Sequence, residues 1–103
     1  MTAGGEPVVA RVNDAVVVRV DGELDLATAP ALRAALERAL ADGDQLVVDL
    51  SAVTFIDSSG LSVLVRAYQV LGVTGTLKVR GPSSQARRLF EMAGVESLID
   101  VES

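Results

Sequence analysis

The chain has 103 residues, half of them apolar and 22% charged, a size and composition that suit one domain with a single core. Its formal net charge is −5 and it has no basic stripe, so we expect no direct nucleic-acid partner. Because it contains no His and no Cys, the usual zinc sites, His-assisted serine catalysis and thiol catalysis are excluded, and we expect a regulatory protein without a cofactor rather than an enzyme.

The chain begins with a segment, residues 1–7, that we expect to be flexible. This segment lacks the basic start and apolar core of a signal peptide, and no later apolar run is long enough to span a bilayer. We therefore expect a cytoplasmic protein with no direct membrane insertion. Strands are predicted over Val8–Val12 and Ala15–Val20, since Asn13-Asp14 between them tolerates the dihedral angles of a hairpin turn. Residues 21–25 are interpreted as an acidic loop.

Helices and strands then alternate. A helix is predicted from the cap Thr28 to Gly43, with Leu32, Leu36, Ala39 and Leu40 as its buried stripe. The further predicted elements are a strand over 45–50, a helix over 58–71, a strand over 76–79, a helix over 83–93 and a weak strand over 98–101. This alternation predicts an α/β domain whose sheet is mixed, mostly parallel after the opening antiparallel hairpin, and packed by three or more helices.

The most informative stretch lies where a strand runs into a helix. An apolar run up to Ile56 ends in Asp57-Ser58-Ser59-Gly60, and an apolar-periodic segment follows at once. A serine at this junction lies on a surface turn, where its hydroxyl either caps the helix or is open to modification. Taken alone, Ser58 or Ser59 is more often a cap than a phosphorylation site, and first-turn geometry could expose either.

Two other features of this helix have alternative interpretations. Gly60 either leaves room for an approaching kinase or nucleotide, or permits a tight turn between strand and helix, and local geometry favours the turn. Val63, Ala67 and Val70 form a second apolar stripe beside the core stripe. The simpler interpretation is that a neighbouring helix covers it; the alternative is a partner-binding face that begins beside Ser58.

Four motifs recur in order along the chain: Gly22-Glu23-Leu24-Asp25, Val48-Asp49-Leu50-Ser51, Phe55-Ile56-Asp57-Ser58-Ser59-Gly60-Leu61 and Leu89-Phe90-Glu91-Met92-Ala93-Gly94. Together they resemble the STAS domain of bacterial anti-sigma factor antagonists. The resemblance covers at least Val8 to Ile99, so residues 8–103 are interpreted as one STAS domain. Many members of that family carry a longer C-terminal helix.

The resemblance implies a mechanism. In that family the unphosphorylated antagonist binds an anti-sigma factor that is also a serine kinase, and so releases a sigma factor. The kinase phosphorylates the serine directly after the aspartate, which is Ser58 here, with Ser59 as the weaker candidate. The phosphorylated form dissociates, and a metal-dependent serine phosphatase restores it.

The expected partner-binding surface comprises Asp25, Asp57, Ser58, Ser59, Gly60 and Val63, with no catalytic residues and no metal ligands. A phosphate at a helix N-terminus meets free backbone N–H groups, so the fold should tolerate it. It adds a charge of about −1.5 to −2 beside Asp57 and, in the family fold, near residues 23–25. Binding should therefore be lost through like-charge repulsion. Asp25 could equally cap the first helix or keep its loop solvated, and Asp49 is expected to have a structural hydrogen-bonding role at a strand end.

Two other functions compete with this reading. Asp57 could be a phospho-acceptor with Mg²⁺, as in response-regulator receivers, but the first strand ends in Val12-Asn13-Asp14 rather than an acidic cluster, and Lys78 lies within a strand. The stronger alternative is a phosphorylation-independent STAS scaffold, including a subunit attached to a membrane transporter.

Overall fold

The computed structural model describes residues 6–96 and 99–102 of the chain. Its elements, in chain order, are β1 (Val8–Val12), β2 (Ala15–Leu24), α1 (Ala29–Asp42), β3 (Gln45–Ile56), α2 (Ser58–Leu71), β4 (Thr76–Arg80), α3 (Ser84–Ala93) and β5 (Asp100–Glu102). The predicted flexible segment falls mostly outside the described residues, as does Leu98 at the start of the last predicted strand.

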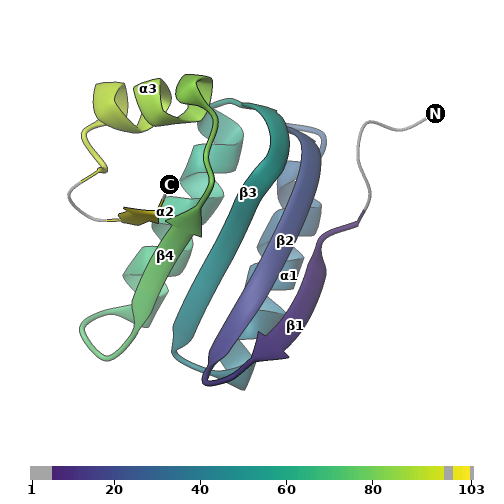
Figure 1. Cartoon of the computed structure of the whole chain (residues 1–103), viewed down its shortest axis with the longest axis vertical. Coiled ribbons are helices and arrows are strands. Elements are labelled where there is room, and N and C mark those ends of the chain that lie inside the picture. The colour runs from purple at the N-terminus through teal and green to yellow at the C-terminus, as the bar shows by residue number, and fades with distance from the viewer. Residues whose placement is uncertain (1–5, 97–98, 103) are drawn as a thin grey trace.

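The strands form one five-stranded sheet in the order β1-β2-β3-β4-β5. β1 and β2 pair antiparallel, with Asn13 in the left-handed region at φ 55° in the turn between them, and the other neighbouring pairs are parallel. Helices α1 and α2 pack against each other behind one face of the sheet, and α3 lies over the end at which β3 stops (Figure 1). The predicted α/β class, with a mixed sheet and an N-terminal antiparallel hairpin, is confirmed.

The core lies between the sheet and the two long helices. Alternate residues of the central strands point into it, for example Val16 and Val18 of β2 and Val48 of β3, and they meet Leu32 of α1 and Leu64 of α2. The described part of the chain buries no polar or charged residue. Every polar or charged side chain among the described residues is therefore exposed or half-buried.

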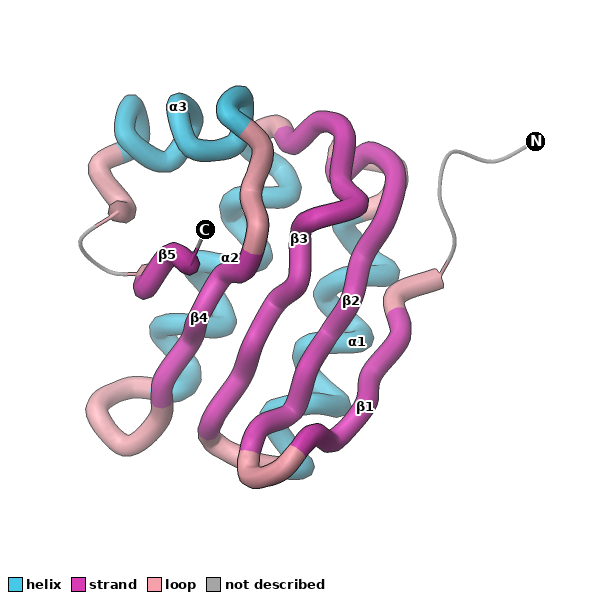
Figure 2. The backbone as a smooth tube through the Cα atoms, in the orientation of Figure 1, coloured by secondary structure: helices cyan, strands magenta, loops and turns pink. Residues whose placement is uncertain are grey.

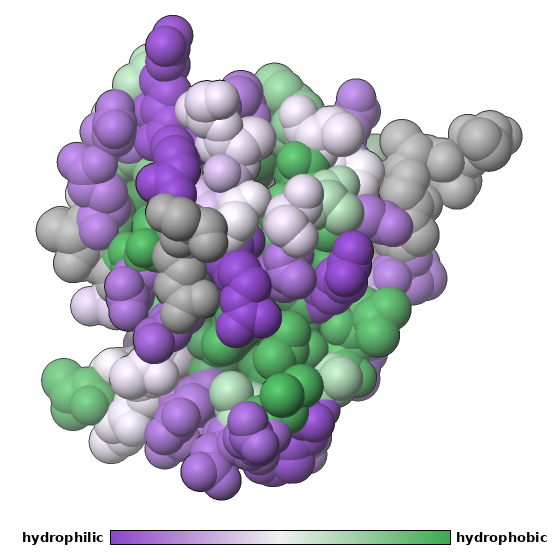
Figure 3. Space-filling model, in the orientation of Figure 1, coloured by the Kyte–Doolittle hydropathy of each residue, from purple (hydrophilic) through white to green (hydrophobic). Residues whose placement is uncertain are grey.

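The opposite face of the sheet is open, and apolar side chains gather on it over β1 to β3 (Figure 3). Val8 and Val12 of the edge strand β1 are exposed. They share this face with Val17 of β2, because Ala10 lies directly opposite Val17 in the antiparallel pair and alternate residues of β1 point the same way.

Two central strands are longer than predicted. β2 runs to Leu24, so the interpretation of residues 21–24 as a loop is wrong, and β3 runs to Ile56 instead of stopping at Leu50. The extra residues pair with each other in parallel, ending at Leu24 opposite Ile56, and this pairing satisfies backbone groups that a loop would leave to water.

The extension contains two register shifts, between Arg19 and Asp21 and between Gly22 and Glu23. At each shift β3 carries one more residue than β2, since residues 19 and 21 pair with 49 and 52, and residues 22 and 23 pair with 53 and 55. Such bulges bend the strand that carries the extra residue, and the trace of β3 bends towards its C-terminal end (Figure 2). The bend directs the end of β3 towards α2.

The second apolar stripe of α2 is divided. Ala67 is buried and Val63 is half-buried where α2 contacts α1, as the simpler interpretation expected, whereas Val70 is 58% exposed. The covering helix therefore protects the stripe near the start of α2 and leaves its end open. The bounds of α2 agree with the prediction, and α3 begins one residue later than predicted because Ser83 serves as its cap, accepting from the Ala86 amide at 3.1 Å.

Candidate functional site

The N-terminus of α2 is capped by an aspartate and not by a serine. Asp57 has extended backbone dihedrals, and its Oδ1 accepts hydrogen bonds from the amides of Ser59 at 2.8 Å and Gly60 at 3.3 Å. Its own amide donates to the Leu24 carbonyl at 3.0 Å, which ties the junction to the end of β2. The alternative that Ser58 or Ser59 caps the helix is therefore wrong, because Asp57 is the cap.

The two serines differ in exposure. Ser58 is exposed as the first residue of α2, whereas Ser59 is half-buried. The Ser58 hydroxyl has no hydrogen-bond partner among the residues that the structure describes, and only the Ser58 carbonyl is engaged, accepting from the Ser62 hydroxyl at 2.8 Å. Ser58 thus presents its hydroxyl group to solvent from the first residue of a capped helix.

The turn between β2 and α1 lies beside this junction. Leu24 and Ile56 are paired at the ends of two parallel strands, and Asp25 and Asp57 directly follow them. Asp25 Oδ1 accepts from the amides of Ala27 at 3.0 Å and Thr28 at 3.2 Å. Two carboxylates that are distant in sequence therefore lie at the same edge of the sheet, as the resemblance implied.

Thr28 occupies the cap position of α1, but its side chain makes no capping bond to the helix. Its hydroxyl instead donates to the Glu23 carbonyl at 2.7 Å and accepts from the Asp25 amide at 2.9 Å. The predicted capping role of the Thr28 side chain is therefore wrong. The hydroxyl ties the end of β2 to the start of α1, and so fixes the acidic turn next to Ser58.

A groove of about 550 Å³ extends from Ser58 along α2. Val63 lines it and also faces a smaller hollow between α1 and α2. The groove is lined on its apolar side by Leu61, Val65 and Val95, and two cations, Arg33 and Arg66, also line it. The predicted site residues Ser58 and Val63 thus share one concave surface, with Asp25 and Asp57 in the turns at its end.

A family model described as STAS domain matches residues 6–103. The chain belongs to the STAS domain family. It is 33% identical over 87 residues to an anti-sigma-B factor antagonist of Bacillus subtilis, covering 84% of this chain and 80% of that protein. It is 37% identical over 89 residues to an anti-sigma-F factor antagonist of Mycobacterium tuberculosis, covering 85% and 73% of the two chains.

A solved structure is also similar to this STAS domain. The crystal structure of an anti-sigma factor antagonist from Mycobacterium paratuberculosis superimposes with a TM-score of 0.87 at 35% sequence identity, covering 93% of this chain and 83% of that one. The resemblance drawn from the four sequence motifs is therefore confirmed at the level of the family and of the fold.

Gly60 permits a tight junction between strand and helix in this STAS domain. It is buried in the first turn of α2 and its φ is not positive, so it acts through its missing side chain and not through a left-handed backbone. A Cβ atom there would lie 2.9 Å from the Leu24 Cβ and 3.0 Å from the Ile56 Cγ1. The missing side chain lets α2 approach the ends of β2 and β3, and this approach places Ser58.

Two exposed apolar side chains beside the acidic turns were also not anticipated. Leu26, directly after Asp25, is 78% exposed, and Phe55, two residues before Asp57, is 42% exposed. Their place beside the acidic turns makes both side chains available to a partner that contacts those turns. The only sequence signal was their place at the motifs, since Phe55 opens the third motif and Leu26 directly follows the first.

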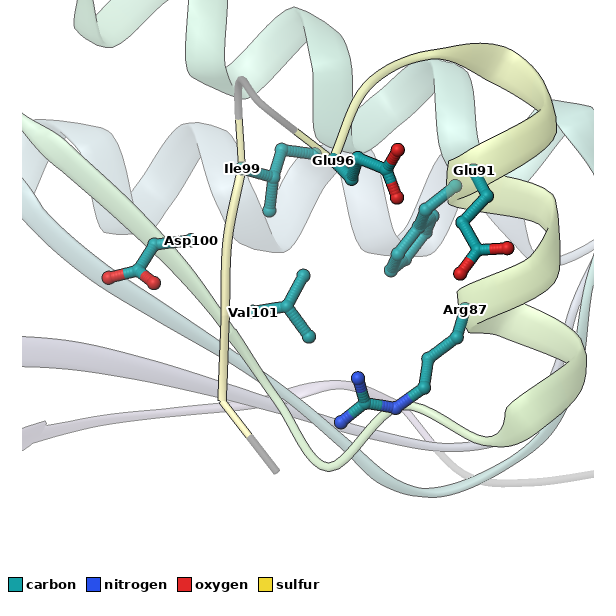
Figure 4. Close-up of a pocket in the computed structure, with 7 residues that line it drawn as sticks. Arg87, Glu91, Glu96, Ile99, Asp100 and Val101 are labelled. Atoms are coloured by element: carbon teal, nitrogen blue, oxygen red, sulfur yellow. The ribbon is translucent and has the colours of Figure 1, made fainter.

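A further hollow, of about 480 Å³, lies between α3 and β5 (Figure 4). The side chains around it include Arg87, Glu91, Glu96 and Asp100, and none of the predicted site residues lines it. Within residues 6–96 and 99–102, no group of three or more acidic side chains is placed to hold a metal ion, and no helix is long and apolar enough to cross a membrane.

Asp49 has the structural role that was expected, although it lies inside β3 and not at its end. Its Oδ1 accepts from the Ser51 amide at 3.0 Å and the Ser51 hydroxyl at 2.7 Å, and it stands in register between Arg19 of β2 and Arg80 of β4. Burial by itself would raise the pKa of Asp49, but the bonds from Ser51 and the two arginine charges lower the pKa below its ordinary value.

We expect Asp49→Asn to destabilise the fold only where the carboxylate is charged. Because the folded-state pKa of Asp49 is depressed, its contribution is present above the unfolded pKa of about 3.9 and is lost as the pH falls through the folded value. The variant should lose less than about 1 kcal/mol of unfolding free energy at pH 7. The measurement is urea unfolding of both proteins at pH 7 and pH 3; an equal difference at the two values would contradict the prediction.

Proposed function

We propose that this STAS domain is an anti-sigma factor antagonist. In this proposal the unphosphorylated chain binds an anti-sigma factor that is also a serine kinase and so releases a sigma factor, and phosphorylation of Ser58 ends the binding. The proposal is supported by the names of the relatives, which are anti-sigma-B and anti-sigma-F factor antagonists. The observation that carries it is the exposed Ser58 hydroxyl, which has no partner within the described residues while Asp57 caps the helix.

Ser58 suits a kinase better than Ser59 does. Phosphoryl transfer needs a hydroxyl that a second protein can reach, and Ser58 is exposed whereas Ser59 is half-buried. The Asp57 cap and the bond from the Asp57 amide to the Leu24 carbonyl hold the backbone next to Ser58. This reduces the conformational entropy that is lost when a kinase aligns the hydroxyl with its nucleotide. The chain is the substrate in this reaction, and the acid–base chemistry belongs to the kinase and to the serine phosphatase that reverses it.

The local charges explain how the phosphate would act. The amides of Ser59 and Gly60, which a phosphate at a helix start would otherwise bind, already donate to Asp57. The expectation that free first-turn amides receive the phosphate is therefore wrong for these two groups. The phosphate would add a charge of about −1.5 to −2 next to the Asp57 carboxylate.

The same arrangement makes the surface sensitive to that charge. Without phosphate, Leu26 and Phe55 offer apolar contact area and Asp25 offers a fixed carboxylate beside them. A partner that fits this surface has to desolvate it. A phosphate on Ser58, directly after Asp57, raises the cost of desolvation and repels any acidic group on the partner, so binding is lost while the fold remains intact.

The test begins with the intact mass and the peptide map of the chain purified from its native cells in two growth states. We expect one phosphoryl group on Ser58 whose occupancy differs between the states. Against an anti-sigma factor kinase of the same organism, the phosphorylated chain should bind at least about 100-fold more weakly than the unmodified chain.

The matched control is Ser59→Ala, which should be phosphorylated and released from the kinase like wild type. Ser58→Ala cannot accept the phosphate, so it should remain bound to the kinase in the presence of ATP. Unmodified protein in every state, together with a Ser58→Ala variant that behaves as wild type, would refute the proposal. That outcome would indicate the phosphorylation-independent STAS scaffold, such as a transporter-associated subunit.

A further inference from the structure

A side chain from α3 pairs with the last residue of β3. The Ile56 amide donates to Gln85 Oε1 at 3.0 Å, and Gln85 Nε2 donates to the Ile56 carbonyl at 2.7 Å. One primary amide thus satisfies both backbone groups of a single residue, as a neighbouring strand would. Ile56 directly precedes Asp57 and is two residues from Ser58.

Gln85 can pair with Ile56 because β3 extends beyond the end of its neighbour β4. The last β4 residue in register with β3 is Arg80, opposite Asp49, so β4 does not reach the final seven residues of β3, from Leu50 to Ile56. On the other side, β2 continues to Leu24 opposite Ile56. Gln85 therefore replaces the missing strand at the residue that leads into α2.

We propose that Gln85 is a positioning residue for Ser58, an inference that rests on the proposed function. Asp57 is fixed from the β2 side by the bond between its amide and the Leu24 carbonyl. Gln85 fixes the preceding residue from the α3 side, so the backbone that carries Ser58 is held on both sides. Although Gln85 is exposed, both the oxygen and the nitrogen of its side-chain amide are hydrogen-bonded to Ile56.

The position of Gln85 is itself well anchored. It is the second residue of α3, one residue before the buried Ala86, and the Ser83 hydroxyl caps the same turn. Phe90, one turn further along, is buried in the core. A shift of α3 would therefore be transmitted to Ile56 through the Gln85 amide.

The chemistry requires glutamine at this position. The Ile56 amide needs an acceptor and the Ile56 carbonyl needs a donor, and the neutral glutamine amide offers them on two separate atoms at every pH. A carboxylate offers acceptors alone, so Gln85→Glu would place a negative charge against the Ile56 carbonyl oxygen. Protonation of that carboxyl would supply the missing donor, so its pKa is expected to lie above the usual value of about 4.3.

The first experiment compares amide NMR signals of the free protein for wild type, Gln85→Glu and Gln45→Glu. Gln45 is the matched control, because it is an exposed glutamine at the other end of the same strand. We expect Gln85→Glu at pH 8 to shift the Ile56 and Ser58 amide signals and to accelerate exchange of the Ile56 amide. As the pH falls to 5, the signals should move back towards those of wild type, while Gln45→Glu leaves them unchanged throughout.

The second experiment measures phosphoryl transfer to the same three proteins by the kinase that phosphorylates wild type. A misplaced hydroxyl should lower kcat about tenfold or more for Gln85→Glu and leave KM within about twofold. Unshifted Ser58 signals in the free variant would overturn the proposal, and so would an unchanged kcat. A raised KM with unshifted signals would instead assign Gln85 to direct contact with the kinase.

The two experiments separate this inference from the function on which it rests. A wild-type chain that accepts no phosphate would refute the proposed function, whereas the NMR comparison would still show whether Gln85 sets the position of Ser58 in the free protein.

Discussion

Leu24→Ala is expected to lower the free energy of unfolding by about 3–4 kcal/mol, the range for a leucine removed from a closely packed core. Leu24 is 1% exposed at the end of β2, and its Cβ would be the nearest neighbour of any side chain placed at Gly60. Loss of the Leu24 side chain beyond Cβ leaves a cavity under the first turn of α2. The ends of β2 and β3 cannot move to fill it, because Leu24 and Ile56 are paired with each other in the sheet. Urea unfolding at pH 7 measures the difference.

The chain contains a matched control for this prediction two residues away. Leu26 is 78% exposed, so Leu26→Ala should change the free energy of unfolding by no more than about 0.5 kcal/mol. The same variant should weaken partner binding, since it removes apolar contact area from the proposed binding surface. Equal losses of stability for the two variants would show that Leu24 is not part of the core.

Gly60→Ala should destabilise the fold by about 2 kcal/mol, although alanine is normally the better helix former by about 1 kcal/mol. The added methyl would lie 2.9 Å from the Leu24 Cβ and 3.1 Å from the Leu24 carbonyl oxygen. Contacts this short require α2 to move away from β2, because a backbone oxygen paired within the sheet cannot yield as a flexible side chain can. Thermal and urea unfolding would give the loss of stability.

Ser62→Ala tests whether the loss at position 60 comes from the clash and not from a change in the first turns of α2. Ser62 is exposed, and the substitution removes only its bond to the Ser58 carbonyl. Its effect should stay within about 0.5 kcal/mol. A Gly60→Ala protein as stable as wild type would mean that the helix and the strands do not approach as closely as the structure shows.

Local patterns predicted the α2 helix correctly, because its signals are local: an acceptor residue before the first turn, apolar residues at helical spacing and a glycine at its end. The ends of β2 and β3 were missed for the opposite reason. Asp21-Gly22 and Ser51-Ala52 have poor strand propensity, yet residues 21–24 and 52–56 pair with each other across the sheet. Pairing between distant segments outweighed local preference.

In the candidate site, too, residues within local motifs were predicted, whereas roles that depend on contacts between distant segments were not. Ser58, Asp57 and Asp25 were predicted from their motifs, and the structure places the two carboxylates at one edge of the sheet. The packing role of Gly60 depends on where α2 meets β2, and no spacing in the sequence indicates that contact. Gln85 gave no signal at all, since its partner lies 29 positions away in the chain.

The capping bonds of Asp57 bear on how the domain would respond to a phosphate on Ser58. Because Asp57 already occupies the amides of Ser59 and Gly60, neither amide is available to bind the phosphate. On the proposed function, the fraction of chain that carries phosphate would then follow the balance between kinase and phosphatase activity. The fold would contribute no preference of its own through these two amides.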